Sequence, residues 1–230
     1  MVNTKKRTIR RVYEFSVGLR LTHWLRAISI TFLVVSGFYL AYVFVAPVVN
    51  PEPTNFMNAK WRAAHQIVGF ILIACFIFKF YLFVIDKESR KEVISFSDAI
   101  NPKIWIAQIK YYLFLGPHPH LKGVYNPLQF VAYAFFYVIL FLICLTGLVL
   151  YVHVYHDGLG GLLYAPMRAI ESMMGGLATV RLVHHICMWI IMIFVPVHVY
   201  MVIFNAIKGK DGAADAIVSG YKYIDEEQTA

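Results

Sequence analysis

The sequence predicts an all-α integral membrane protein, a bundle of four membrane-spanning helices. Two facts of composition support this fold class: hydrophobic residues make up 60% of the 230 residues and charged residues only 15%, which is outside the usual range of soluble domains. The third observation is a set of stretches without Asp, Glu, Lys or Arg, at residues 27–51, 63–78, 123–156 and 182–207. A spanning helix needs about 20 mainly apolar residues. We therefore expect a single membrane domain over residues 1–230, which excludes a separate soluble catalytic domain.

The first two spans follow from the first two stretches. We place the first span at about residues 24–46, ending before Pro47 in a short outer loop. The second span covers about residues 63–85 and continues past Lys79. The long side chain of Lys79 is near the inner end of that span, so we expect it to extend to the lipid headgroups without a special partner.

An interfacial helix is expected between the second and third spans. Residues 101–115 contain Trp, two Tyr and flanking Lys, and they are bounded by Pro102 and Pro117. This composition is typical of a helix on the membrane surface, and the segment is too short to cross. The third span then covers about 128–152 and the fourth about 182–206, joined by an outer loop that contains two Gly-Gly pairs.

The net charge of +8 follows the membrane rather than a nucleic acid. Seven Lys and Arg residues lie in the N-terminal arm and the first turn of the first span, six lie between the second and third spans, and three lie in the C-terminal tail. The other two loops together hold four. Cytoplasmic loops carry the excess of Lys and Arg. Both termini and the interfacial helix are therefore predicted on the cytoplasmic side, and a nucleic-acid partner has no support.

The three cysteines do not suggest a cofactor site. They are widely separated within the spans, at Cys75, Cys144 and Cys187. This spacing gives neither a disulfide framework nor a set of iron–sulfur ligands, and no Cys-x-x-Cys-His sequence for covalent haem attachment occurs. We interpret them as small core residues.

Four of the nine histidines fall at matched depths in the predicted spans. His23 opens the first span on the inner side, and His65 opens the second on the outer side. In the fourth span, His184 lies near the outer end and His198 is 14 residues further inward, which is about 21 Å along a helix and about 40° from the same face. His65 can thus face His184, and His23 can face His198.

Two facing histidines at each depth favour haem over a metal ion bound by side chains alone. A structural zinc ion prefers four protein ligands. A porphyrin supplies four equatorial nitrogens and needs only two axial side chains from facing helices, so the pairs predict bis-histidine haem b at each depth.

Arginine and glycine residues near these histidines agree with bound haem. Arg20, Arg62 and Arg181 each stand three residues before a candidate ligand, a spacing that keeps both side chains on one side of a helix and suits haem propionates. Arginine is also common at helix ends. Gly37 and Gly69 lie near the proposed faces and give room for a flat ring, although small residues also serve ordinary helix packing.

The other five histidines are not assigned to haem. His153, His156 and His185 are at the outer ends of the third and fourth spans and are interpreted as interfacial, while His118 and His120 belong to the inner loop.

Two segments resemble the signatures of a known family. The first reads Arg20-Leu21-Thr22-His23-Trp24-Leu25 and leads to Leu33 and Ser36-Gly37; the second reads Arg181-Leu182-Val183-His184-His185-Ile186, then Trp189, Phe194 and His198. They resemble the first-helix and fourth-helix signatures of the cytochrome b subunits of membrane-bound nickel–iron hydrogenases. Ser36 departs from the Thr that this family usually has before the Gly.

The resemblance implies a membrane anchor in the bacterial inner membrane with two haem b groups, held at His23, His65, His184 and His198. Its partners would be the iron–sulfur small subunit and the nickel–iron large subunit of a periplasmic hydrogenase, and hydrogen would not be split on this chain. Electrons would enter at the outer haem and leave at the inner haem to menaquinone or ubiquinone. Cytochromes of formate dehydrogenase and thiosulfate reductase share this architecture and are the alternative.

A candidate quinone contact lies at the inner start of the third span. Asn126 and Gln129 are three residues apart at the predicted depth of His23 and His198, and their amides can hydrogen-bond a quinone carbonyl. Helix capping explains Asn126 equally well, because it precedes Pro127.

Two functions of other classes remain. A transporter could use intramembrane histidines as a proton relay, but the spans lack acidic partners. A structural anchor would leave four depth-matched histidines unexplained. Visible haem bands separate both from a cytochrome.

Overall fold

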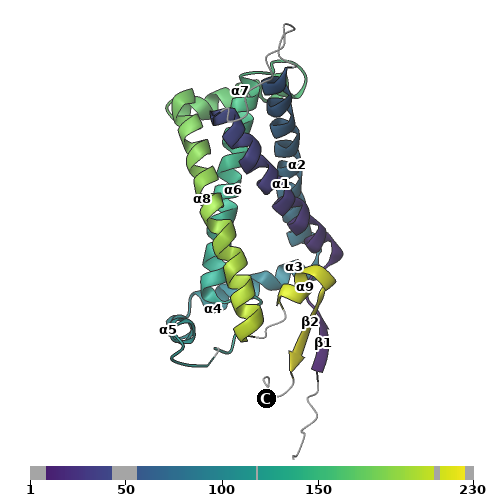
Figure 1. The fold of residues 1–230 in the computed structure, drawn as a ribbon, viewed down its shortest axis with the longest axis vertical. Helices are drawn as coiled ribbons and strands as arrows, with labels where there is room; N and C mark the ends of the chain where they lie inside the picture. The colour runs from purple at the N-terminus through teal and green to yellow at the C-terminus, as the bar shows by residue number, and fades with distance from the viewer. Residues whose placement is uncertain (1–8, 43–55, 118, 210–212, 226–230) are drawn as a thin grey trace, which may run out of the picture. The chain divides into compact units, whose positions relative to one another are not determined.

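Four long helices dominate the computed structural model, which describes residues 9–42, 56–117, 119–209 and 213–225. They are α1 (Val17–Tyr42), α2 (Met57–Ile85), α6 (Pro127–Val152) and α8 (Leu177–Phe204) (Figure 1). Each is long and apolar enough to cross a membrane. The predicted fold class, an all-α membrane protein with four spanning helices, is confirmed.

The observed helices begin earlier than the apolar stretches. Helix α1 starts at Val17, α2 at Met57 and α8 at Leu177, each five to seven residues before the predicted span. Hydropathy locates the part of a helix in the apolar layer, whereas the backbone hydrogen bonds of the helix continue past it into polar residues. The predicted end of the first span and most of the loop after it lie outside the described residues.

Short helices fill the segment between α2 and α6. Helix α3 (Lys87–Arg90), the 3-10 turn η1 (Lys91–Ile94) and α4 (Ser95–Ala99) lead to α5 (Pro102–Tyr112). Helix α5 corresponds to the helix predicted over 101–115. It begins where Asn101 Oδ1 accepts a hydrogen bond from Lys103 N–H at 3.1 Å, with Pro102 in the first turn.

The connection between α6 and α8 holds a helix that was expected to be a loop. Helix α7 (Leu159–Met173) contains Gly160 and Gly161 in its first turn. The second Gly-Gly pair does end a helix, because Gly175 and Gly176 adopt φ of 85° and 100°, which L side chains rarely adopt. A Gly-Gly pair alone therefore does not mark a loop.

The first and the last described segments of the chain form a small sheet. Strand β1 (Ile9–Tyr13) pairs antiparallel with β2 (Tyr221–Asp225), which follows η2 (Asn205–Gly209) and α9 (Ala213–Ser219) (Figure 1). These strands were not predicted from the sequence.

The chain divides into two compact units. Unit 1 comprises Met1–Thr22, Lys79–Ala134 and Val195–Ala230, and unit 2 comprises His23–Phe78 and Phe135–Phe194. All four long helices contribute to both units, so each unit holds one end of every span.

The core of unit 2 contains residues from all four long helices. Its buried members are Ile30 from α1, Leu72 from α2, Phe136, Ile139 and Leu140 from α6, and Cys187 and Ile191 from α8. Lipid is as apolar as these side chains, so their close packing rather than exclusion from water stabilises the contacts. A second cluster joins α7 to α6 and α8 through Met167, Val149, Val152 and Val180.

Unit 1 contains an ion pair that corrects one prediction. Lys79 Nζ lies 2.7 Å from Glu92 Oε1, and only 12% and 18% of the two side chains are exposed. Tyr125 Oη donates a second hydrogen bond to the same oxygen at 3.3 Å. The expectation that Lys79 extends to the headgroups without a special partner is wrong, because η1 brings a carboxylate to the end of α2.

Asp98 fixes the segment that leads into α6. Its Oδ2 accepts hydrogen bonds from the backbone N–H groups of Lys122 and Gly123, both at 2.8 Å, and the side chain is 1% exposed. Ser95 Oγ accepts a third backbone bond from Tyr125 N–H at 3.0 Å. Helix α4 therefore anchors the start of α6.

Candidate haem-binding site

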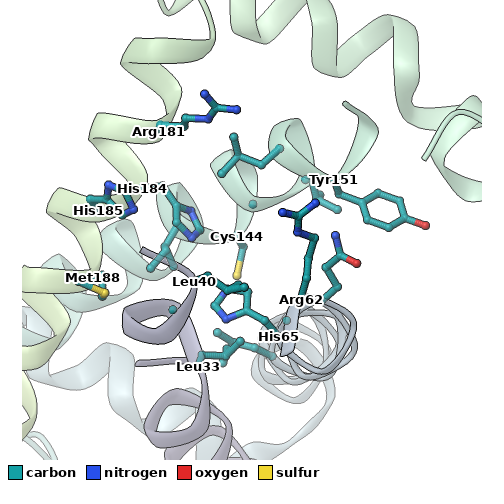
Figure 2. Close-up of a pocket in the computed structure, with 18 of the residues that line it drawn as sticks. Leu33, Leu40, Arg62, His65, Cys144, Tyr151, Arg181, His184, His185 and Met188 are labelled. Atoms are coloured by element: carbon teal, nitrogen blue, oxygen red, sulfur yellow. The ribbon is translucent and has the colours of Figure 1, made fainter. Parts of the chain in front are cut away.

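A cavity of about 660 Å³ lies in unit 2 among the four long helices. This volume is within the range of about 300–1,000 Å³ that is usual for cofactor sites. His65 enters it from α2 and His184 from α8, as Figure 2 shows. The structure thus brings the two histidines of the predicted outer pair to one cavity.

The hydroxyl of Ser36 holds the His65 ring. Ser36 Oγ lies 2.8 Å from His65 Nδ1 and also donates to the backbone carbonyl of Phe32 at 2.8 Å. Ser36 is fully buried in α1. Because its one proton is directed to the carbonyl, the oxygen accepts a hydrogen bond from Nδ1–H, and the lone pair of His65 is then on Nε2.

His184 has the same arrangement with a residue of α6. Thr146 Oγ1 lies 2.9 Å from His184 Nδ1 and donates to the backbone carbonyl of Leu142 at 2.7 Å. Thr146 is also fully buried. His184 therefore presents Nε2, like His65, as the nitrogen with a free lone pair.

A glycine lies beside each ring. A Cβ atom at Gly37 would lie 3.4 Å from His65 Cε1, and one at Gly147 would lie 3.6 Å from His184 Cε1. An alanine Cβ would be in van der Waals contact with the ring at either position, so a side chain that extends further toward the ring would collide with it. Gly69 has open space beside it and lines the cavity, as a site for a flat ring requires.

Two arginines stand at one end of the cavity. Arg62 and Arg181 line it, and Figure 2 shows both on the same side of the two histidines. Neither guanidinium forms an ion pair with another described residue. Both can therefore bind carboxylates of a ligand. Arg20 differs, because its Nη1 donates to the backbone carbonyl of Val218 at 2.7 Å in unit 1.

The donor set fits haem b and not a metal ion alone. Within the described ranges, no three His, Cys, Asp or Glu side chains are close enough to hold a metal ion together. The cavity instead offers two imidazole nitrogens, apolar walls that include Leu33, Leu148 and Met188, and two free arginines. Two axial nitrogens, an apolar pocket and cations for propionates are what a bis-histidine haem needs.

The predicted inner pair has one member in each unit. His23 belongs to unit 2, where its ring contacts Trp24 edge to face with 5.3 Å between ring centroids. His198 belongs to unit 1, where its Nδ1 lies 3.5 Å from Tyr133 Oη. Pairing of His23 with His198 stays a prediction.

Asn126 and Gln129 form a reciprocal helix cap. Gln129 Oε1 accepts from Asn126 N–H at 3.2 Å, and Asn126 Oδ1 accepts from Gln129 N–H at 2.9 Å. Asn126 Nδ2 donates to Tyr112 Oη at 3.0 Å. The capping alternative therefore explains both amide oxygens, and the –NH₂ group of Gln129 is the part left for the predicted quinone contact.

The histidines predicted to be interfacial take several roles. His153 Nε2 lies 2.5 Å from Glu171 Oε2, which Arg168 Nη1 also contacts at 2.5 Å. The hydrogen bond with His153, together with the charges of His153 and Arg168, holds the pKa of Glu171 below its usual range. His153 and His185 also line the cavity. His118 lies outside the described residues.

Sequence reasoning missed Thr146 and Gly147. A signal was present, because Thr146-Gly147 repeats in the third span the hydroxyl-glycine pair Ser36-Gly37 of the first. Gly37 was predicted to give room for a flat ring, but Ser36 was considered only as part of a family signature, so its contact with His65 was not inferred.

Comparisons with known proteins find relatives among b-type cytochromes. A family model described as prokaryotic cytochrome b561 matches residues 14–220. The probable Ni/Fe-hydrogenase B-type cytochrome subunit of Cupriavidus necator is 27% identical, over 94% of this chain and 88% of that protein. The protein of the same name from Azotobacter vinelandii is 28% identical over 97% and 93%. The probable Ni/Fe-hydrogenase 1 B-type cytochrome subunit of Escherichia coli K12 is 26% identical over 91% and 90%.

Proposed function

Because the chain belongs to the prokaryotic cytochrome b561 family, we propose that it is the membrane subunit of a nickel–iron hydrogenase and carries electrons across the membrane to quinone through two haem b groups. The observation that supports this most strongly is the cavity with His65 and His184 on facing helices, each with Nδ1 held by a buried hydroxyl. The similarity to Ni/Fe-hydrogenase B-type cytochrome subunits supports the hydrogenase partner.

At the outer level, each side chain has a defined task. His65 and His184 would supply the nitrogens that hold the iron, Arg62 and Arg181 would bind the propionates, and the apolar wall would limit the access of water. Haem iron, when bound, would supply one-electron transfer chemistry. The inner level would use His23 and His198 in the same way.

Electrons are proposed to arrive from the iron–sulfur small subunit on the periplasmic side and to leave to menaquinone or ubiquinone on the cytoplasmic side. The excess of Lys and Arg in the segments that hold the termini and α5 supports this orientation. The residue proposed for quinone is Gln129, through its –NH₂ group.

The test compares difference spectra of membranes reduced with hydrogen and then with dithionite. We expect b-type bands with hydrogen in the wild type. His184→Ala should lose the outer haem, while His156→Ala, at an exposed histidine that does not line the cavity, should keep both. Bands that appear only with dithionite would point to another donor, such as formate. The absence of bands from this chain would contradict the haem proposal and favour a transporter or a structural anchor.

The quinone contact is tested separately from the helix cap. Gln129→Glu keeps an acceptor for Asn126 N–H but removes the –NH₂ donor. We expect this variant to fold with both haems reducible by hydrogen and to lose quinone reduction. Unchanged quinone reduction would remove Gln129 from the site.

A further inference from the structure

The outer cavity is built from one arrangement that occurs twice. Helix α1 presents Ser36-Gly37 to His65 of α2, and α6 presents Thr146-Gly147 to His184 of α8. In each case the hydroxyl contacts Nδ1 and the glycine lies next to Cε1. The two histidines are therefore held in the same way by residues from two separate helix pairs.

The direction of both hydrogen bonds follows from the number of protons. A serine or threonine hydroxyl has one proton and two lone pairs. Ser36 donates its proton to the carbonyl of Phe32 at 2.8 Å, and Thr146 donates to that of Leu142 at 2.7 Å. Both hydroxyls are fully buried, so water does not compete for them. The only role left toward the imidazole is that of acceptor from Nδ1–H.

The adjacent glycine leaves room beside the ring. Neighbouring residues on a helix point about 100° apart, so the hydroxyl reaches Nδ1 while the glycine next to it places no side chain against Cε1. Cβ atoms at the two glycines would lie 3.4 Å and 3.6 Å from Cε1, which is van der Waals contact, so each ring lies beside the glycine of its neighbouring helix. The opposite edge, with Nε2, is left to the cavity.

We propose that Ser36 and Thr146 are positioning residues that hold His65 and His184 in the Nδ1–H tautomer and thereby set the electron-donating strength of the Nε2 atoms toward haem iron. This inference rests on the proposed function, because it assigns haem to this cavity. An acceptor for the second ring N–H makes a ligating imidazole more basic. A more basic ligand stabilises ferric iron, so the two hydroxyls lower the midpoint potential of the outer haem.

The test is a redox titration of the full chain in detergent, monitored through the visible absorption bands of the haems. Thr146→Val replaces the hydroxyl with a methyl group of similar size. We expect an upward shift of the outer haem's potential, an unchanged inner haem and a loss of about 10-fold to 100-fold in outer haem affinity. Thr146→Ser should restore both quantities, and Ser36→Ala should act in the same direction as Thr146→Val.

A matched control is available on α1. Thr31 donates to the carbonyl of Ala27 at 2.9 Å, as Ser36 and Thr146 do to theirs, but it is exposed and has no hydrogen bond to a histidine in the part of the chain that the structure describes. Thr31→Val should leave both potentials unchanged. If Thr31→Val shifts the midpoint potential of the outer haem as much as Thr146→Val does, the inference is overturned. It is also overturned if a Thr146→Val chain that holds both haems has an unchanged outer potential.

A further variant covers the case in which Thr146→Val does not retain the outer haem. Thr146→Cys keeps a weak acceptor and should give a smaller upward shift. A potential equal to that of the wild type in this variant would overturn the inference. If the wild-type chain shows no haem bands, the proposed function fails instead, so the two failures are distinguishable.

Discussion

Replacing Lys79 with Met should destabilise the protein strongly, because the change leaves the Glu92 carboxylate without its ammonium partner. The two charged atoms are 2.7 Å apart, and more than four-fifths of each side chain is shielded from solvent. Breaking a buried pair on one side costs about 3–5 kcal/mol. We expect about 3 kcal/mol here, since both groups keep some exposure. Glu92→Gln should cost a similar amount.

The double variant decides whether the cost comes from an unpaired charge. Lys79→Met combined with Glu92→Leu removes both charges, and a buried pair can be replaced by apolar residues at little cost. We therefore expect the double variant to be more stable than either single variant. Denaturation of the purified chain in detergent, followed by circular dichroism, measures the three free energies of unfolding.

Lys87→Met serves as the control, because Lys87 is an exposed lysine near the same end of α2. Its cost should stay within about 0.5 kcal/mol. If Lys79→Met costs no more than this control, the reasoning from the ion pair is refuted and Lys79 behaves as a lysine that reaches the headgroups.

Three further predictions concern other contacts. Asp98→Ala removes the acceptor of two backbone N–H groups and should lower the free energy of unfolding by about 3 kcal/mol, measured by the same denaturation; a change below about 1 kcal/mol would contradict the anchoring role. Gly123→Ala would place a Cβ in collision with the Ser95 backbone and should lower the free energy of unfolding at least as much. Gly69 has open space beside it, so Gly69→Ala should leave the free energy of unfolding of the haem-free chain nearly unchanged. Glu171 has a lowered pKa through its bond with His153, so its contribution is present above the ordinary glutamate pKa and is lost as the pH falls through the lowered value. Thermal unfolding at decreasing pH should show this loss, and Glu171→Gln should remove it; an identical pH dependence in both proteins would refute the assignment.

The sequence was sufficient to predict the long helices and the matched depth of His65 and His184, which line one cavity, for a physical reason. An apolar layer requires long uncharged stretches, so hydropathy alone identifies α2 and α6. Depth along an antiparallel bundle is set by residue count at 1.5 Å per residue. His65 and His184 could therefore be matched in depth without knowledge of the contacts between helices.

The contacts that orient these groups were not predictable in the same way. Thr146 and His184 are 38 residues apart, and their hydrogen bond depends on how α6 and α8 are rotated against each other. The partner of Lys79 lies in η1, whose short turn has no hydropathy pattern. The cap formed by Asn126 and Gln129 could have been predicted from the sequence, because Asn-x-x-Gln before an apolar run is a capping-box pattern.

The pairing of β1 with β2 limits how the chain can be threaded through a membrane. Five residue pairs join them, from Ile9 opposite Asp225 to Tyr13 opposite Tyr221. Hydrogen-bonded strands must share one aqueous compartment, so the chain between them returns to the side from which it departed. The number of crossings is consequently even, whichever side that is. A topology with an odd number of crossings, in which α5 also crosses the membrane, is excluded. Topology reporters fused to the N-terminus and to the C-terminus should therefore report the same side of the membrane.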